Sequence, residues 1–338
     1  MSFILLATAS LSANHYSDYC DSCNHYNVYA EWLFFRAAGE SVDVATISTG
    51  TTNDPDEPRV TSDDWKRIDV CPDWDSGYRL GFSTDLKCAR LFGEWTWYAT
   101  DKKTKFNFIG PSTDNQTFRV SSDFLGIQNN NLETYDLISN FHFSYYRLDI
   151  GLERRIIDCN RVSFSPFAAF TYYQTNQDLK AQDSTLYVAP VDTSETRKFN
   201  GKTQYNGFGA SLGYNVVWEM FDCLALYSKG IFTAAYGSSE VNYDFNRVND
   251  QFAGNDNTFH FSFDKSRGRY ITSVQVGLRT ETCICGCYQI FGMVGWESQI
   301  LFDQTDWMVK TDINFPDGYK PSANLYLQGL VVRAGISF

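Results

Sequence analysis

The chain has 338 residues and a mass of 38.6 kDa, and its 28 basic and 40 acidic residues give a net charge of −12. This charge would repel phosphates, so nucleic acid is excluded as a partner. An apolar content of 43% excludes disorder, and no apolar run reaches the roughly 18–20 residues of a membrane helix. A transmembrane β-barrel is not excluded by a mean hydropathy of −0.33, because its alternating strands average to a polar composition.

The first thirteen residues are predicted to be the apolar part of a secretory signal peptide. They end in the small residues Ser10, Ser12 and Ala13, which suit a signal peptidase. The basic segment that normally comes first is missing, so the signal is expected to begin upstream of Met1. An ordinary first strand is the alternative. We therefore expect a signal over residues 1–13 and a single mature domain over residues 14–338.

Strands are predicted wherever apolar and polar residues alternate, since this period places two different faces on one strand. Near the chain end, for example, Leu330, Val332, Ala334 and Ile336 alternate with Val331, Arg333, Gly335 and Ser337. The same pattern predicts ten strands, near residues 26–38, 74–84, 89–100, 140–157, 162–175, 203–218, 223–237, 269–282, 288–302 and 324–338.

The connections between these strands are short and long in turn. The long ones are polar, and are expected near Glu40–Pro72, Asp101–Glu133, Asn176–Lys202, Ser238–Gly268 and Asp303–Ser322. Long loops at one end and tight turns at the other are typical of up-and-down antiparallel barrels of the bacterial outer membrane. An even strand number places both termini on the short-turn, periplasmic side, with the long loops outside the cell.

Two features leave the strand number open between ten and twelve. The long loops are able to form strands of their own, which would give twelve. Within 140–157 the apolar phase changes at Tyr145–Tyr146, and a β-bulge would explain this change.

The two faces of the strands predict two sets of functional residues. Charged residues on the polar face are costly against lipid and are expected to line the lumen: Arg79, Arg90, Glu94, Arg147, Asp149, Glu153, Arg155, Lys229, Arg279, Glu281, Glu297 and Arg333. Aromatic residues expected at the membrane interfaces are Trp32, Trp95, Trp97, Trp218, Tyr236 and Trp296. In a soluble sandwich the charged set would be solvated and the aromatic set would form the core.

Catalytic and cofactor motifs are missing. The chain has four histidines, no Gly-x-Ser-x-Gly elbow, no phosphate loop and no dinucleotide fingerprint, so neither an enzyme nor a cofactor is predicted. Cys20-x-x-Cys23 lies near His15 and His25, but no second such pair follows, so no metal site is predicted either.

The nine cysteines gather at one end of the predicted barrel. Eight of them lie before the first strand or beside short turns and are disulfide candidates: Cys20, Cys23, Cys88, Cys159, Cys223, Cys283, Cys285 and Cys287. Only Cys71 lies at the opposite end. An odd total of nine cysteines, with eight of them at one end, favours intermolecular, periplasmic cross-links to envelope proteins or to another copy, while a few internal pairs plus a free thiol are the alternative.

The chain ends in an alternating strand that closes on Phe338, which resembles the C-terminal signal read by the barrel assembly machinery. With this layout, the sequence resembles the major outer membrane protein-like, pore-forming family of chlamydia-related bacteria and Legionella. The matching segments are residues 29–36 (YAEWLFFR), 145–154 (YYRLDIGLER), 162–170 (VSFSPFAAF) and 327–330 (LQGL). Ala169–Thr171 depart from the Gly and Arg of the family, so no lumen arginine is carried over there.

The resemblance implies a porin in the outer membrane and a role in a cysteine-rich envelope. We therefore expect passive diffusion of ions and small polar solutes through a barrel held in outer-membrane lipid, with weak ion selectivity because the lumen charges nearly balance. In a barrel this narrow, the many long side chains inside are also able to fill the lumen and block it. The alternative is a structural or adhesive barrel with a blocked lumen, and a secreted carbohydrate-binding sandwich is a third.

Overall fold

The structure is a computed structural model that describes residues 26–39, 43–51, 64–69, 72–109, 116–121, 132–159, 161–187, 193–221, 223–249, 257–284, 288–305 and 323–338. All regular elements in these ranges are β-strands. No helix within them is long and apolar enough to cross a membrane. The predicted signal peptide over residues 1–13 lies outside the described residues.

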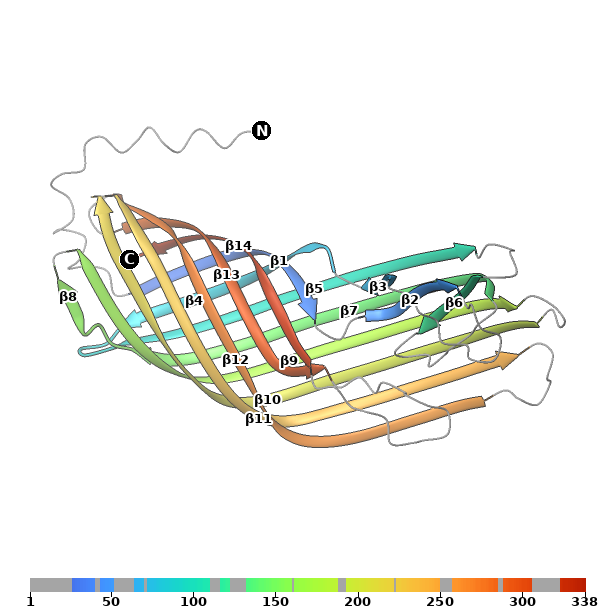
Figure 1. The fold of residues 1–338 in the computed structure, drawn as a ribbon. Helices are drawn as coiled ribbons and strands as arrows, with labels where there is room; N and C mark the ends of the chain where they lie inside the picture. Colours follow the sequence, from blue (N-terminus) through green and yellow to red (C-terminus); the bar gives the residue numbers. More distant parts are fainter. Residues whose placement is uncertain are drawn as a thin grey trace.

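Ten strands of the described chain form a closed antiparallel barrel (Figure 1). They are β1 (Tyr26–Gly39), β4 (Trp74–Asp85), β5 (Arg90–Ile109), β7 (Leu132–Glu153), β9 (Val162–Tyr187), β10 (Thr193–Phe221), β11 (Leu224–Asn249), β12 (Asn257–Ile284), β13 (Tyr288–Thr305) and β14 (Ala323–Ser337). Each strand pairs with its neighbours along the chain, and β14 closes the ring onto β1. Tyr26 and Phe338 exchange two backbone hydrogen bonds of 2.9 Å, so the two ends of the barrel wall meet at the short-turn end. The predicted fold class and strand number are confirmed.

Further strands belong to the connections and not to the barrel wall. β2 (Asp43–Thr51), β3 (Asp64–Asp69) and β6 (Gln116–Ser121) form a separate three-stranded sheet, and the short β8 (Ile157–Cys159) pairs with β9 beside a turn. The long connections therefore do form strands, as the sequence allowed, but these strands leave the barrel at ten and not twelve.

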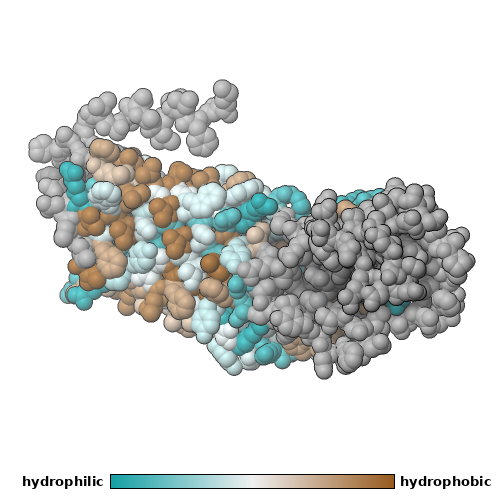
Figure 2. Space-filling view, viewed as in Figure 1, coloured by the Kyte–Doolittle hydropathy of each residue, from teal (hydrophilic) through white to brown (hydrophobic). Residues whose placement is uncertain are grey.

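Exposed apolar side chains surround the barrel near its short-turn end. Figure 2 shows this surface in brown on the face turned toward the viewer, between the grey atoms at the two ends. Exposed side chains such as Leu212, Phe170 and Val294 point outward from it. Farther along the same strands, the outward positions are polar, as at Asn200 and Asp244. A membrane therefore surrounds the short-turn part of the barrel, and the long-loop part extends beyond it.

The strands extend much farther toward the long-loop end than the sequence predicts. β9, β10, β11 and β12 contain 26, 29, 26 and 28 residues. Most of the loops expected near Asn176–Lys202 and Ser238–Gly268 are therefore strand, which corrects that prediction. Beyond the membrane the outward face is polar, and the inward face mixes apolar residues such as Phe199 with polar residues such as Arg197. The sequence there therefore lacks the apolar and polar alternation of the membrane part and was predicted to be a loop.

The structure also corrects the bulge predicted at Tyr145–Tyr146. The pairing of β7 with β5 runs without interruption from Ile109↔Thr134 to Arg90↔Glu153. Tyr145 points into the barrel and is buried, whereas Tyr146 is on the outer side. The apolar phase changes because the apolar environment moves from outside the wall to inside it, and the backbone stays regular.

Candidate functional site

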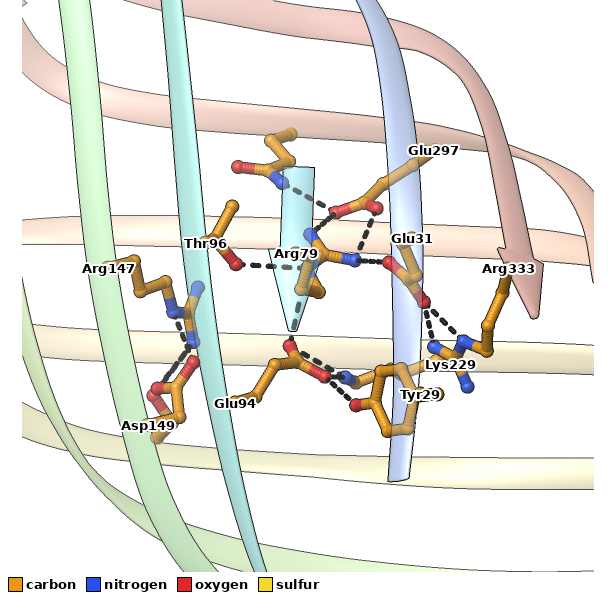
Figure 3. A network of polar contacts seen from close by, with 12 residues as sticks. Tyr29, Glu31, Arg79, Glu94, Thr96, Arg147, Asp149, Lys229, Glu297 and Arg333 are labelled. Carbon is orange, nitrogen blue, oxygen red and sulfur yellow. Dashed lines mark hydrogen bonds and ion pairs between the residues drawn. The ribbon is translucent and has the colours of Figure 1, made fainter. Parts of the chain in front are cut away.

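The lumen at the level of the membrane is crossed by a network of ion pairs centred on Arg79 (Figure 3). The Arg79 guanidinium from β4 donates to Glu31 at 2.7 Å and to Glu297 at 3.0 Å. It also donates to the Thr96 hydroxyl at 2.9 Å and lies 3.5 Å from Glu94. These partners come from β1 and β5, the two neighbours of β4, and from β13, which β14 and β1 separate from β4, so the network spans one side of the wall.

A second cation, Lys229 on β11, completes the arrangement from the opposite side. Its ammonium donates to Glu94 at 2.8 Å, and the Tyr29 hydroxyl donates to the same carboxylate at 2.6 Å. Arg333 pairs with Glu31 and lies over the Tyr29 ring, 4.3 Å from its centre. Each carboxylate therefore has at least one cationic partner, as buried charges require.

Space for this network is provided by a glycine. A Cβ on Gly81 would overlap the Tyr29 ring. The absence of a side chain at this position lets the ring lie flat along the inner wall, where its hydroxyl reaches Glu94.

A second polar cluster lies beside the first. Arg147 donates to Asp149 at 2.7 and 3.1 Å, and it also donates to the Ser211 hydroxyl at 3.2 Å and the Thr233 hydroxyl at 3.1 Å. Thr171 donates to Asp149 at 2.5 Å. These residues come from four adjacent strands, so the cluster covers the inner wall of β7, β9, β10 and β11.

Above these charges, toward the long-loop end, the lumen is filled by apolar side chains. Leu33, Phe35, Tyr98, Phe143 and Val331 are at most 1% exposed. They belong to one continuous core cluster, and Tyr98 donates a hydrogen bond to the backbone carbonyl of Phe35 at 3.1 Å. An aqueous channel at this level would leave side chains of this kind wet, whereas here they are buried against one another.

A further charged cluster lies beyond the membrane. Glu195 on β10 accepts from Arg197 at 2.5 Å and pairs with Arg247 at 2.6 Å. Burial alone would raise the pKa of Glu195, but the two arginines outweigh burial and hold this pKa below its usual value.

The structure brings six of the predicted lumen residues into the two polar clusters: Arg79, Glu94, Arg147, Asp149, Lys229 and Glu297 are all buried. Arg333 joins them through Glu31. Four more of the predicted residues lie closer to the short-turn mouth and are partly exposed: Arg90, Glu153, Arg279 and Glu281.

Arg155 was expected in the lumen, but β7 ends at Glu153 and Arg155 is exposed in the turn that follows. The strand predicted near residues 140–157 was four residues too long at this end.

Several lumen residues were missed. Glu31 is followed by Trp32, Leu33 and Phe34, so its strand is almost uniformly apolar. The sequence of this strand therefore does not show which residues face the lumen and which face the lipid. The uncharged Gln275 and Ser211 were omitted because only charges were sought. Successive side chains of a strand point to opposite faces. Counting in steps of two from lumen-facing residues would therefore have identified both residues as inward-facing.

The six predicted interface aromatics all lie on the outer side of the wall. Trp32, Trp218, Tyr236 and Trp296 are exposed, while Trp95 and Trp97 are partly covered by other rings. The terminal Phe338 is also exposed, with its ring centre 5.8 Å from that of Tyr26.

The described cysteines lie at the short-turn end. Cys88, in the turn between β4 and β5, and Cys223, in the turn between β10 and β11, are free thiols, whereas Cys283 is not. Cys159 ends β8. The candidates Cys20, Cys23, Cys285 and Cys287 lie outside the described residues. Within the described ranges, no group of three or more His, Cys, Asp or Glu residues is arranged to hold a metal ion.

Solved structures with a similar fold are outer-membrane barrels. The outer membrane protease OmpT of Escherichia coli is 10% identical, with 94% of this chain and 98% of that chain covered and a TM-score of 0.44. The toluene transporter TodX of Pseudomonas putida is 7% identical, with 93% and 89% covered and a TM-score of 0.26. A FadL homologue of Pseudomonas aeruginosa is 8% identical over the same shares, with a TM-score of 0.25. These likenesses concern the fold, and a search of the curated proteins finds no match.

A family model covers nearly the whole chain. The model described as Legionella pneumophila major outer membrane protein precursor matches residues 20–338. Together with the closed barrel and its apolar outer surface, this match places the protein in the bacterial outer membrane. The chain belongs to the Legionella major outer membrane protein family.

Proposed function

We propose that this protein is a structural outer-membrane barrel with a lumen closed to solutes, and that it acts through the part that extends beyond the membrane. The observation that carries the proposal is the double filling of the lumen. Arg79 and its carboxylate partners cross it at the level of the membrane, and the apolar layer that includes Leu33 and Phe143 fills it above.

This arrangement suits a supporting wall better than a channel. A selective pore must leave a continuous wet path lined by groups that bind solutes weakly. Here the charged groups are buried and saturated by one another, and Arg79 alone contacts three carboxylates. The Arg79 contacts join neighbouring strands from β13 to β5, and the pair of Lys229 with Glu94 joins β11 to β5 across the lumen, so together they hold the wall in fixed register. No catalytic step forms part of this proposal.

The free thiols add a second part to the proposal. Cys88 is exposed and Cys223 is half-buried, both in short turns. Short turns face the periplasm in outer-membrane barrels, where the redox environment permits disulfides. We propose that these thiols link the barrel to envelope proteins or to a second copy, and that the barrel assembly machinery reads the terminal strand.

Solute flux through the wild-type barrel tests the closed lumen. The protein is reconstituted into liposomes, and swelling is recorded in isotonic sugars of graded size. Heat-modifiable migration on a gel confirms that the barrel is folded. We expect swelling no faster than in protein-free liposomes for every sugar. Size-dependent swelling would contradict the proposal.

Passive diffusion of small polar solutes is the second candidate function. The observation that favours it is the chemistry of the membrane-level lumen, where the described side chains include six alternating charges held by reversible ion pairs. Such a layer is able to exchange partners and admit water, whereas an apolar plug is not. If liposomes swell only with variants in which these charged residues are replaced, the charged layer closes the wild-type barrel. If liposomes with the wild-type protein swell, the barrel is a porin.

A further inference from the structure

Five exposed lysines gather on the outer face of the extension, which is the part of the barrel beyond the membrane. They lie on β5, β9 and β10, which β7 joins into one run of neighbouring strands (Figure 1): Lys103, Lys105, Lys180, Lys198 and Lys202. The register places Lys103 and Lys180 in one row, with only Asn140 of β7 between them. The next row runs from Lys105 to Lys198. The five lysines therefore form a single surface, the lysine patch.

The charge of this face differs from that of the strands beside it. Three acids share the face with the five lysines. Asp101 pairs with His142 at 2.7 Å, Asp136 accepts from Asn107 at 2.5 Å, and the third acid is Asp178. The same face of β11 and β12 carries acids and, among its described residues, no lysine or arginine: Glu240, Asp244 and Asp264. In a chain with a net charge of −12, a face with more lysines than acids suits an anionic partner.

An apolar groove lies on the same run of strands, at the level of the membrane. Its volume is about 360 Å³. Five side chains line it: Leu148, Ile150, Phe170, Tyr172 and Phe208. The rings of Tyr172 and Phe208, with centres 4.8 Å apart, lie at its long-loop end. The next outward residue of β10 is the polar Asn206, so the groove ends where the membrane surface begins.

We propose that the groove and the lysine patch together bind a phosphorylated glycolipid of the outer leaflet. An acyl chain of the lipid fills the groove, and its anionic sugars extend along the wall to the lysines. Phosphate oxygens accept strong, charge-assisted hydrogen bonds from lysine ammonium groups. The long connections of outer-membrane barrels face the outside of the cell, so the patch lies on the side of the outer leaflet.

The separation between groove and patch selects the kind of lipid. Lys202 lies six positions along β10 from Phe208. This is about 20 Å along the strand, or about 15 Å of height at the usual tilt of barrel strands. The phosphate of a phospholipid adjoins its acyl chains and would stay below the patch. A lipooligosaccharide carries phosphates and carboxylates on several sugars above its acyl chains, so it is tall enough to reach the lysines. The proposal does not depend on whether the lumen conducts solutes.

Native mass spectrometry of the full-length barrel in detergent tests the proposal by counting bound lipids. The first probe is a lipooligosaccharide with a phosphorylated core, and the second is the same lipid after enzymatic removal of its phosphates. Phosphatidylglycerol provides a negative charge without a tall headgroup, and the soluble core oligosaccharide provides the phosphates without acyl chains. We expect the wild-type protein to bind the first probe about tenfold or more tightly than each of the other three.

Charge variants locate the headgroup. Lys103→Gln/Lys180→Gln/Lys202→Gln should weaken binding of the phosphorylated lipooligosaccharide about tenfold and leave the dephosphorylated lipid unchanged. The matched control replaces three exposed cations at the short-turn end, and should bind like the wild type: Lys87→Gln/Arg154→Gln/Arg161→Gln. Folding of each variant is checked by heat-modifiable migration.

A groove variant locates the acyl chain. Ile150→Trp fills the groove but keeps the lipid-facing surface apolar, and it should weaken the phosphorylated lipooligosaccharide several-fold. Leu278→Trp, at an exposed lipid-facing position of β12 away from the groove, should leave binding unchanged.

Four results would overturn the proposal. Equal affinity for phosphatidylglycerol would show that the lysines take no part, and equal affinity for the soluble oligosaccharide would show that the groove takes none. An equal loss in the two triple variants would reduce the effect to overall charge. Wild-type protein that retains no lipooligosaccharide would exclude the site.

Discussion

Removing Arg79 should destabilise the barrel more than removing any surface cation. Arg79 is 4% exposed and pairs with Glu31, Glu94 and Glu297. Three carboxylates are balanced in this network by three cations, Arg79, Lys229 and Arg333. The change Arg79→Met therefore leaves a net charge of −1 in a buried site. Breaking a buried ion pair from one side costs about 3–5 kcal/mol, because the remaining charge loses its partner but not its desolvation.

The assay is urea unfolding in micelles, followed by tryptophan fluorescence and by gel migration. Arg90→Met is the matched control, because Arg90 pairs with Asp85 at 2.6 Å while both side chains are more than a third exposed. Exposed pairs of this kind contribute less than about 1 kcal/mol. The double variant Arg79→Met/Glu297→Gln should recover part of the loss, since it restores the charge balance. If Arg79→Met cost no more than Arg90→Met, the network would not stabilise the barrel.

Three other predictions concern the membrane, the extension and the thiols. Leu212→Arg, on the lipid-facing side, should cost about 2–4 kcal/mol in the same unfolding assay, and Asn200→Arg on the same strand beyond the membrane should cost little. The depressed pKa of Glu195 means that its contribution to stability is complete above the ordinary glutamate pKa of about 4.3 and is lost as the pH falls through its lower folded value. After correction for the intrinsic pH dependence of amide exchange, protection near residues 193–199 should therefore fall on acidification in the wild type but not in Glu195→Gln, and equal pH profiles of protection would contradict the ion-pair account. Disulfide-linked species on non-reducing gels of native membranes should diminish in the double variant Cys88→Ser/Cys223→Ser, and an unchanged pattern would exclude these thiols.

The barrel was predictable because lipid outside the wall and polar groups inside it impose a strict alternation on each strand. That alternation located all ten strands, and the pattern of turns gave the closed topology. The sequence predicted the strands only as far as the membrane surface. Beyond it, strands such as β10 have polar residues outside and a mixture of polar and apolar residues inside, such as Arg197 and Phe199. A single hydrophilic strand of this type looks like a loop without knowledge of its neighbours.

The lumen was predictable in its charges but not in its closure. A period of two identifies Arg79 and Glu297 as inward-facing, but it does not say that two residues 218 positions apart in the sequence meet. That contact depends on which strands face one another across the barrel and on its diameter. The apolar layer was missed for a related reason, since inward-facing Phe143 and Tyr145 have the same composition as outward-facing residues and differ only in phase.

Single-channel recording of the wild-type protein in a planar bilayer tests the closed lumen most directly. The two filled layers predict a baseline without conductance steps in molar salt, at both polarities and over long recordings. Discrete, reproducible steps from folded wild-type protein would contradict closure and would identify the barrel as an open pore.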